Sequence, residues 1–184
     1  MRSAYLLALV AGALSVAACS PETSRPDATG KGTVRGINAI PTSPDIAFLV
    51  EERSAGAIGY KGSTEAREWD DLEYTFNFET LLGGETELTR IASRFIDVVD
   101  NMDYVLAVSG DLATPAVTLW KGPQPEFAES ATAFEVRFGH LAAIEGDVDV
   151  FFAADGFDPA AGQEIGTLSY PEALEPRQFE GFPD

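Results

Sequence analysis

The stretch that decides the fold is Tyr74-Thr75-Phe76-Asn77-Phe78-Glu79, in which large aromatic residues alternate with polar ones. Successive side chains of a β-strand point to opposite faces, so this period of two predicts a strand with one buried aromatic face. We expect the aromatic side chains to belong to the core. A sugar-binding platform built from them and from Trp69 is the less favoured interpretation.

Further short β-prone runs surround this strand. Residues 104–108 and 117–120 are both bounded by turn residues. Residues 86–99 could be drawn as a helix, but their β-branched side chains favour a strand. The other candidate strands are residues 33–39, 45–51, 57–60, 67–69 and 87–97. Several short strands separated by turns at this spacing predict an all-β protein, an antiparallel β-sandwich of two sheets.

The chain repeats itself in its last third. Val34-Arg35 and Val136-Arg137 lie 102 residues apart, and at the same offset Asn38 matches His140. Further along, the offset becomes 110 and pairs Tyr60 with Tyr170. The eight extra residues fit a loop-like stretch at 154–164. Other matched pairs are Asp45 with Asp147, Ile46 with Val148, Arg67 with Arg177 and Trp69 with Phe179. Two ordered blocks of this kind indicate tandem domains.

Five segments follow from these patterns: a signal peptide at 1–18, a flexible tether at 19–31, a first sandwich repeat at 32–121, a linker at 122–132 and a partial second repeat at 133–184. The second repeat has no counterpart of the strands at 74–78, 104–108 and 117–120. A truncated reading frame is the explanation that we favour. The alternative is that these strands pack onto the first domain or onto a partner.

The repeated residues also carry a family resemblance. Val34-Arg35-x-x-Asn38-Ala39-x-Pro41, followed by Pro44-Asp45-Ile46-Ala47-Phe48, resembles the start of domain of unknown function 4397, a family of exported bacterial proteins. Residues 136–150 look like the same start, departing from it at Leu141 and Ile144, and residues 103–110 are similar to a late strand of the family. The resemblance implies an immunoglobulin-like sandwich, often in tandem, and no catalytic residue. A structural turn motif is expected at Asn38, Pro41, Asp45, His140 and Asp147.

The N-terminus has the layout of a secretory signal. One positive charge, Arg2, precedes an uncharged apolar run at residues 6–18, which is too short to span a membrane as a helix. The run ends in Val16-Ala17-Ala18-Cys19, which resembles the lipobox of bacterial lipoproteins, with a mild departure at Val16. Cys19 is the only cysteine, so we predict that it carries the lipid. An ordinary signal cleavage with Cys19 incidental is the less favoured alternative.

Charge limits the classes of partner. Without residues 1–18 the chain has 166 residues, 11 basic and 30 acidic side chains, and a net charge of −19. Nucleic acids and anionic lipid headgroups attract clustered Lys and Arg, so neither is an expected partner. The acidity itself is best explained by solubility and self-repulsion at a crowded surface, and cation binding or a saline habitat is the alternative.

No set of residues predicts catalysis. Ser109 lacks the glycine that would precede it in a nucleophile elbow, and His140, the only histidine, occupies the position of Asn38 in the first repeat. We expect Asn38 and His140 each to make hydrogen bonds at this turn. The neighbouring carboxylates Asp70, Asp71 and Glu73 cannot face each other across a cleft as glycosidase carboxylates do. An enzyme is therefore not expected.

No cofactor and no metal are expected. One histidine and one cysteine make a zinc site improbable. Asp97, Asp100, Asn101 and Asp103, and the pair Asp155 and Asp158, offer hard oxygen ligands but do not fit the EF-hand spacing. Asp and Asn are common turn residues, which is the favoured interpretation, although calcium binding stays open.

The sequence thus predicts a membrane-anchored lipoprotein of the cell envelope with a non-catalytic structural, display or adhesion role. The alternative is a carbohydrate- or small-ligand-binding module, which would require Trp69 and Trp120 to line one open face. The membrane is the expected contact, through the N-terminal lipid, and an envelope protein or glycan partner stays open. Because Ser20 rather than Asp follows Cys19, sorting rules of Gram-negative lipoproteins favour the outer membrane in such a host.

Overall fold

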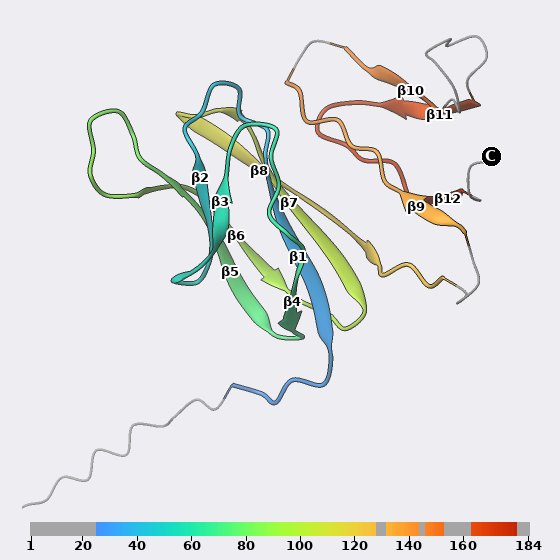
Figure 1. The fold of residues 1–184 in the computed structure, drawn as a ribbon, viewed down its shortest axis with the longest axis horizontal. Coiled ribbons are helices and arrows are strands. Elements are labelled where there is room, and N and C mark those ends of the chain that lie inside the picture. The colour runs from blue at the N-terminus through green and yellow to red at the C-terminus, as the bar shows by residue number, and fades with distance from the viewer. Residues whose placement is uncertain (1–24, 128–131, 144–145, 153–162, 180–184) are drawn as a thin grey trace, which may run out of the picture.

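The computed structural model describes residues 25–127, 132–143, 146–152 and 163–179 (Figure 1). These residues form strands, turns and irregular segments, and none of them is helical. The predicted all-β fold class is therefore confirmed. The strands are β1 Lys31–Asn38, β2 Ile46–Val50, β3 Arg53–Ile58, β4 Arg67–Asp70, β5 Glu73–Thr80, β6 Thr89–Asp97, β7 Met102–Asp111, β8 Thr114–Pro123, β9 Phe134–Val136, β10 Val148–Phe152, β11 Gln163–Leu168 and β12 Arg177–Phe179.

The first eight strands form a sandwich of two four-stranded sheets, which we call the first unit. One sheet has the order β4-β1-β7-β8 and the other the order β3-β2-β5-β6. Every pairing is antiparallel except that of β1 with β7, which is parallel. The predicted two-sheet sandwich is confirmed by this arrangement.

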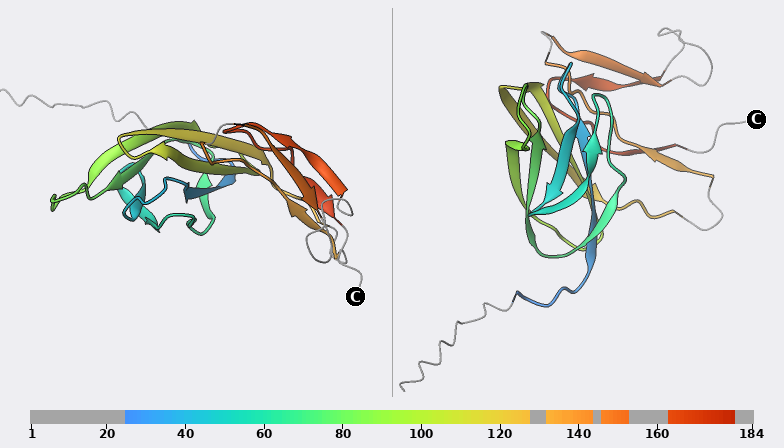
Figure 2. Two further views of the ribbon diagram at one scale, coloured as in Figure 1. Left: turned by 90° about the horizontal axis from the view of Figure 1, so that it is seen from above. Right: turned by 60° about the vertical axis from the view of Figure 1, so that its left-hand side comes forward.

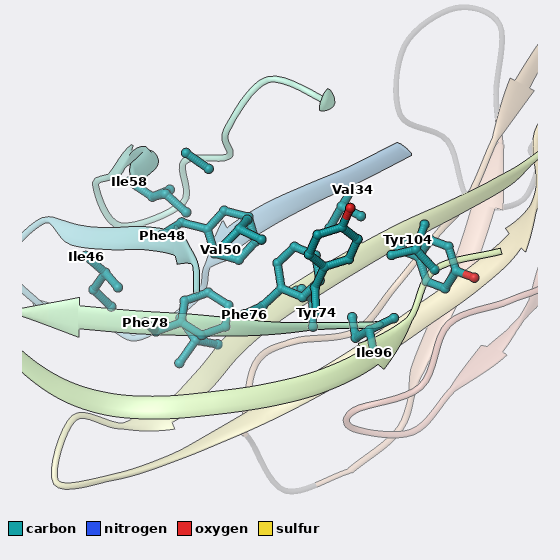
Figure 3. Packing of buried hydrophobic residues seen from close by; sticks show 14 of the residues in the cluster. Val34, Ile46, Phe48, Val50, Ile58, Tyr74, Phe76, Phe78, Ile96 and Tyr104 are labelled. Atoms are coloured by element: carbon teal, nitrogen blue, oxygen red, sulfur yellow. The ribbon is translucent and has the colours of Figure 1, made fainter. Parts of the chain in front are cut away.

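The core lies between the two sheets and combines aliphatic side chains with aromatic rings from β2, β5 and β7 (Figure 3). Phe76 and Phe78 of β5 are completely buried, as the alternation in the sequence predicted. The ring of Phe48 from β2 lies 5.7 Å from that of Phe76 and 5.2 Å from that of Phe78, centroid to centroid. Burying such a side chain stabilises the fold by about 1.5–3 kcal/mol, so these three rings are a principal contribution to the first unit.

Two sequence predictions about strands have clear outcomes. The stretch at 86–99 contains strand β6 and no helix, so the preference for a strand is confirmed. The strand expected at 57–60 starts earlier, at Arg53, and the predicted start is wrong. Only Glu51 and Glu52 separate β2 from β3, and Glu51 adopts a positive φ of 56°. Gly and Asn are the residues that usually indicate such a tight turn, and neither occurs at this one.

Strands β9–β12 form a second, smaller unit of two two-stranded sheets, β9 with β12 and β10 with β11. The backbone pairing of this unit copies that of the first at the two offsets. Val136 pairs with Arg177 as Val34 pairs with Arg67. The register of β10 and β11 shifts between Val150 and Phe151, and that of β2 and β3 shifts at the equivalent place. The predicted boundaries of the five segments themselves stay a prediction.

Candidate functional site: the cleft between the two units

The second unit packs against the outer face of the sheet β4-β1-β7-β8. Both views of Figure 2 place its orange and red strands to one side of the first unit. The hydroxyl groups of Ser109 in β7 and Tyr170 share a hydrogen bond of 2.9 Å, and Ser109 is completely buried. The indole N–H of Trp120 in β8 donates to the carbonyl oxygen of Pro171 at 3.2 Å. The side chains of Ser109 and Trp120 therefore both contact the second unit.

Two glycines permit the close approach. A Cβ atom at Gly139 would overlap the indole ring of Trp120, and a Cβ atom at Gly122 would overlap the guanidinium group of Arg137. Ile37 stands at the position of the first unit that matches Gly139, since the two lie 102 residues apart. The small residue in the second unit is thus explained by the indole ring that lies against it.

A cleft of about 560 Å³ lies between the units, within the size range of ligand sites. Its floor is the outer face of the sheet. Strand pairing places Arg35, Val105 and Trp120 in one row across β1, β7 and β8. Thr33 and Asp103 line the cleft from the neighbouring row. This floor is held by the ladder of a sheet whose other face is packed in the core, so it is rigid.

The second unit and the connecting segment supply the other walls. Phe134 and Glu135 of β9 and the following Arg137 line the cleft opposite the floor. Pro125 and Phe127 line it from the segment that follows β8, and Phe127 is 44% exposed. The cleft therefore combines apolar walls with a small number of charged groups, which is the usual composition of a binding site.

The charges in the cleft are two of each sign. Arg35 and Arg137 provide the positive charges, and Asp103 and Glu135 the negative ones. Asp103 accepts a hydrogen bond from the Thr33 hydroxyl. Within the described part of the chain, neither guanidinium group makes a hydrogen bond or an ion pair. In a chain with 30 acidic and 12 basic residues, two unpaired arginines in one cleft are chemically available.

Sequence reasoning did not assign this cleft. It used Arg35 and Arg137 only as markers of the repeat and Trp120 only as part of a strand. The alternation along β1 is the signal that could have placed Arg35. Val34 and Gly36 are buried in the sandwich, so the side chain of Arg35 between them points outward. Which outward residues would face the second unit depends on how the units pack, and no periodicity contains that information.

In the predicted turn motif, Asn38 makes the densest set of hydrogen bonds. Its amide group donates to the Ser43 hydroxyl at 2.9 Å and to the Ile58 carbonyl at 3.1 Å, and its Oδ1 accepts from the backbone N–H of Ile40 at 3.0 Å. Pro41 is exposed at the same turn. The carbonyl oxygen of Asp45 accepts a hydrogen bond from the Thr80 hydroxyl. Asn38 thus organises the connection between β1 and β2.

The matching residues of the second unit are His140 and Asp147. His140 is buried, its backbone N–H donates to the Glu172 carbonyl, and its ring lies edge-on to Tyr170 at 6.3 Å. Its Nε2 has no partner among the described residues. Asp147 accepts a hydrogen bond from the Ser169 hydroxyl at 2.6 Å. His140 and Ser109 therefore both contact Tyr170, and Ser109 is shielded from solvent there.

The candidate calcium ligands bind other protein groups. Asp100 accepts from the backbone N–H of Lys31 at 2.8 Å and from the side-chain amide of Asn101 at 2.8 Å. Among the residues that the structure describes, no group of three or more His, Cys, Asp or Glu side chains could hold a metal ion. Asp155 and Asp158 lie outside the described residues.

Of the three neighbouring residues Asp70, Asp71 and Glu73, Asp71 contacts the segment that precedes β1 through its carboxylate. Its carboxylate accepts hydrogen bonds from the Thr29 hydroxyl and the Thr29 backbone N–H. The hydrogen bond from the hydroxyl is the largest cause that lowers the pKa of Asp71 below its ordinary value. The Glu73 carbonyl accepts a hydrogen bond from Arg25, which also lies over the Tyr74 ring. The carboxylate of Asp71 and the backbone carbonyl of Glu73 thus hold residues 25–29 against the first unit.

The two tryptophans do not line one open face. Trp69 is half-buried against the core, with its ring 5.5 Å from that of Tyr74. Trp120 is half-buried on the outer face of the same sheet, in the cleft. The core role expected for Tyr74, Phe76 and Phe78 is confirmed, and the platform that combined Trp69 with Trp120 is not formed.

The predicted lipid attachment residue, Cys19, lies outside the described residues, as does the whole of the predicted signal peptide. Within the parts of the chain that are described, no helix is long and apolar enough to cross a membrane.

Comparison with known proteins identifies the family. The family model described as "Domain of unknown function (DUF4397)" matches residues 32–151, which include every residue of the cleft. The chain belongs to this family. A search of curated proteins finds no match.

Proposed function

We propose that this member of the DUF4397 family is an exported lipoprotein that Cys19 holds at a membrane of the cell envelope, where it acts by non-catalytic adhesion or display. The observation that supports an adhesive role is the cleft between the units. Its floor is a rigid sheet face, and its polar groups include two guanidinium groups that pair with no described residue. Adhesion needs a preorganised surface of this kind rather than a reacting group.

The anchor part of the proposal rests on the lipobox-like sequence Val16-Ala17-Ala18-Cys19. The polar residues 20–24 then separate the lipid from Arg25, where contacts with the first unit begin. In Figure 1 the chain enters the first unit at the lower end of β1, whereas β10 and β11 lie at the upper right. A lipid at Cys19 would therefore leave the second unit facing away from the membrane.

The experiment compares cells that carry the wild-type chain, Cys19→Ser, Val105→Lys or Phe95→Lys. Val105 lies on the floor of the cleft, so a lysine there fills the cleft and adds a charge. Phe95, 58% exposed on β6 of the other sheet, is the matched control. We measure the amount of protein in the membrane fraction and the attachment of cells to a surface and to each other.

Cys19→Ser is expected to leave the membrane fraction and to reduce attachment to the level of cells without the gene. Val105→Lys is expected to stay in the membrane fraction and to lose attachment as well, while Phe95→Lys keeps both. Retention of Cys19→Ser in the membrane would refute the anchor. Full attachment with Val105→Lys would refute the role of the cleft.

A further inference from the structure

Two arginines approach the cleft from its opposite sides. Arg35 projects from β1 on the floor, and Arg137 follows β9 in the opposite wall. They occupy equivalent positions of the two units, and neither pairs with a described residue. A guanidinium group is always charged and presents a planar fork of N–H donors that matches a carboxylate. The cleft thus holds two guanidinium groups, each able to pair with a carboxylate.

The guanidinium group of Arg137 lies against the backbone of β8. Its guanidinium group lies so close to Gly122 that any Cβ atom there would overlap it. Gly122 is in the row next to Trp120, on the same outer face of the sheet. The guanidinium group of Arg137 therefore lies against the outer face of β8.

The apolar part of the cleft is aromatic. Trp120 and Arg35 lie in one row on strands separated by β7, which places their backbones about 10 Å apart. Phe127 adds a second, 44% exposed ring on the side wall. Aromatic rings of this kind give a flat apolar surface on which the C–H face of a sugar ring can pack.

The two acidic residues of the cleft offer hydrogen-bond acceptors. Asp103 already accepts from Thr33, but a carboxylate has capacity for further donors. Glu135 is half-buried on the opposite wall. Hydroxyl groups supply such donors. A free phosphate would use neither the aromatic rings nor these acceptors, and a neutral sugar would leave both guanidinium groups without an anion.

We propose that the cleft binds a short saccharide bearing carboxylate groups: Arg35 and Arg137 pair with the carboxylates, Trp120 and Phe127 contact the sugar rings, and Asp103 and Glu135 accept from hydroxyl groups. This inference rests on the proposed binding role of the cleft and adds the class of ligand. The net charge of −18 repels long polyanions, so a short ligand that fits between the arginines is favoured.

The experiment titrates the full chain, purified in detergent micelles, with three acidic probes: short oligomers of galacturonate, of glucuronate and of mannuronate. Each probe has a matched control, the methyl ester of the same oligomer, which keeps the rings and hydroxyl groups but carries no charge. Inorganic phosphate is a further probe for the anion alone. Isothermal titration calorimetry gives the affinity of each.

At least one acidic oligomer is expected to bind with one saturable site, and its methyl ester about tenfold or more weakly. Arg35→Ala and Arg137→Ala should each weaken binding of the acid by about tenfold or more, because each removes a charge-assisted pair. Arg94→Ala, which removes an exposed arginine of β6, is the matched control and should bind as the wild type does.

A second pair of variants tests the geometry without changing charge. Gly122→Ala should displace the guanidinium group of Arg137 from its position beside residue 122 and weaken binding about as much as Arg137→Ala. Gly83→Ala, where an added Cβ atom meets nothing within 4 Å, should have no effect. A circular dichroism spectrum and an unfolding curve equal to those of the wild type show that each variant is folded.

Three results would overturn the inference: equal binding of acid and methyl ester, unchanged binding by both arginine variants, or no binding of any acidic oligomer. Phosphate binding as tight as that of the best oligomer would also overturn it, because the saccharide would then add nothing. None of these results predicts how cells that carry Val105→Lys attach. That attachment measurement tests the proposed function separately.

Discussion

The two units of this chain have the same strand pairing but bury their side chains differently. Ile46 in β2 of the first unit is completely buried, whereas the matching Val148 in β10 of the second is half-buried. The sheet of β2 also contains β5 and β6 and faces a second four-stranded sheet; β10 pairs only with β11 among the described residues. The strand pairs therefore form in both units, whereas complete burial at this position is found where a second four-stranded sheet covers the first.

A second difference concerns two matching tyrosines. Tyr60 of the first unit is 44% exposed, with the Lys61 ammonium group over its ring. Tyr170 of the second unit reaches the buried Ser109 of the first. The same residue type at the same place in the repeat therefore has a surface position in one unit and an anchoring contact in the other. The second unit packs on the first through this tyrosine.

The largest expected effect distinguishes the two cores. Ile46→Ala should lower the free energy of unfolding by about 2–5 kcal/mol, because it leaves a cavity in a closed core. Val148→Ala, at the matching position, should cost less than about 1 kcal/mol, because its side chain is half-buried and the site can relax. Urea denaturation followed by circular dichroism measures both. Similar losses in the two variants would contradict the difference between the units.

The next effect weakens the contact between the units. Gly139→Ala places a Cβ atom against the rigid indole ring of Trp120, and such overpacking costs about 1–3 kcal/mol. We expect faster amide hydrogen exchange in β10, β11 and β12, while exchange in β2 and β5 is unchanged. Gly83→Ala is the matched control. Unchanged exchange in the second unit would show that Trp120 and Gly139 do not touch.

A smaller effect uses the matching tyrosines. Tyr170→Phe removes the hydroxyl that bonds to Ser109 and should cost about 0.5–1.5 kcal/mol. Tyr60→Phe removes a hydroxyl at an exposed position and should change stability little. Thermal unfolding followed by circular dichroism separates these outcomes. An equal response of the two tyrosines would mean that Tyr170 is as exposed as Tyr60.

The smallest effect concerns the segment that precedes β1. Because its hydrogen bonds with Thr29 lower the pKa of Asp71 in the folded state, their stabilisation is fully present above the ordinary pKa of 3.8 and is lost as the pH falls through the lowered value. Asp71→Asn should imitate the acidic state at neutral pH. We expect slightly faster amide hydrogen exchange at Thr29 in Asp71→Asn and no change in Asp70→Asn. Equal exchange at Thr29 in wild type and Asp71→Asn would contradict this hydrogen-bonded contact.

Much of the fold could be predicted because alternation is a local property. The rings of Phe76 and Phe78 are buried as their spacing indicates, and β6 is a strand as its β-branched residues indicate. The matched residues of the two repeats also have matched backbone pairing, down to the register shift in β2 and β10. The tight turn at Glu51 could not be predicted, because nothing in its residue type indicates a positive φ.

The candidate site could be predicted only in its parts. In the sequence, Arg35 and Arg137 mark the repeat, and Trp120 belongs to a predicted strand. Their position in one cleft depends on the packing of the two units. That packing is set by single contacts, such as the one between Tyr170 and Ser109, which lie 61 residues apart. Non-local contacts of this kind have no periodicity that a sequence pattern could reveal.

The contact between Ser109 and Tyr170 is the most direct test of the account, because these residues belong to different units. A double-mutant cycle of Ser109→Ala and Tyr170→Phe, measured by urea denaturation, isolates their interaction energy. The account predicts a coupling of about 0.5–1.5 kcal/mol, the contribution of one hydrogen bond. Additive effects, with a coupling below about 0.3 kcal/mol, would contradict the packing of the second unit on the first and with it the cleft.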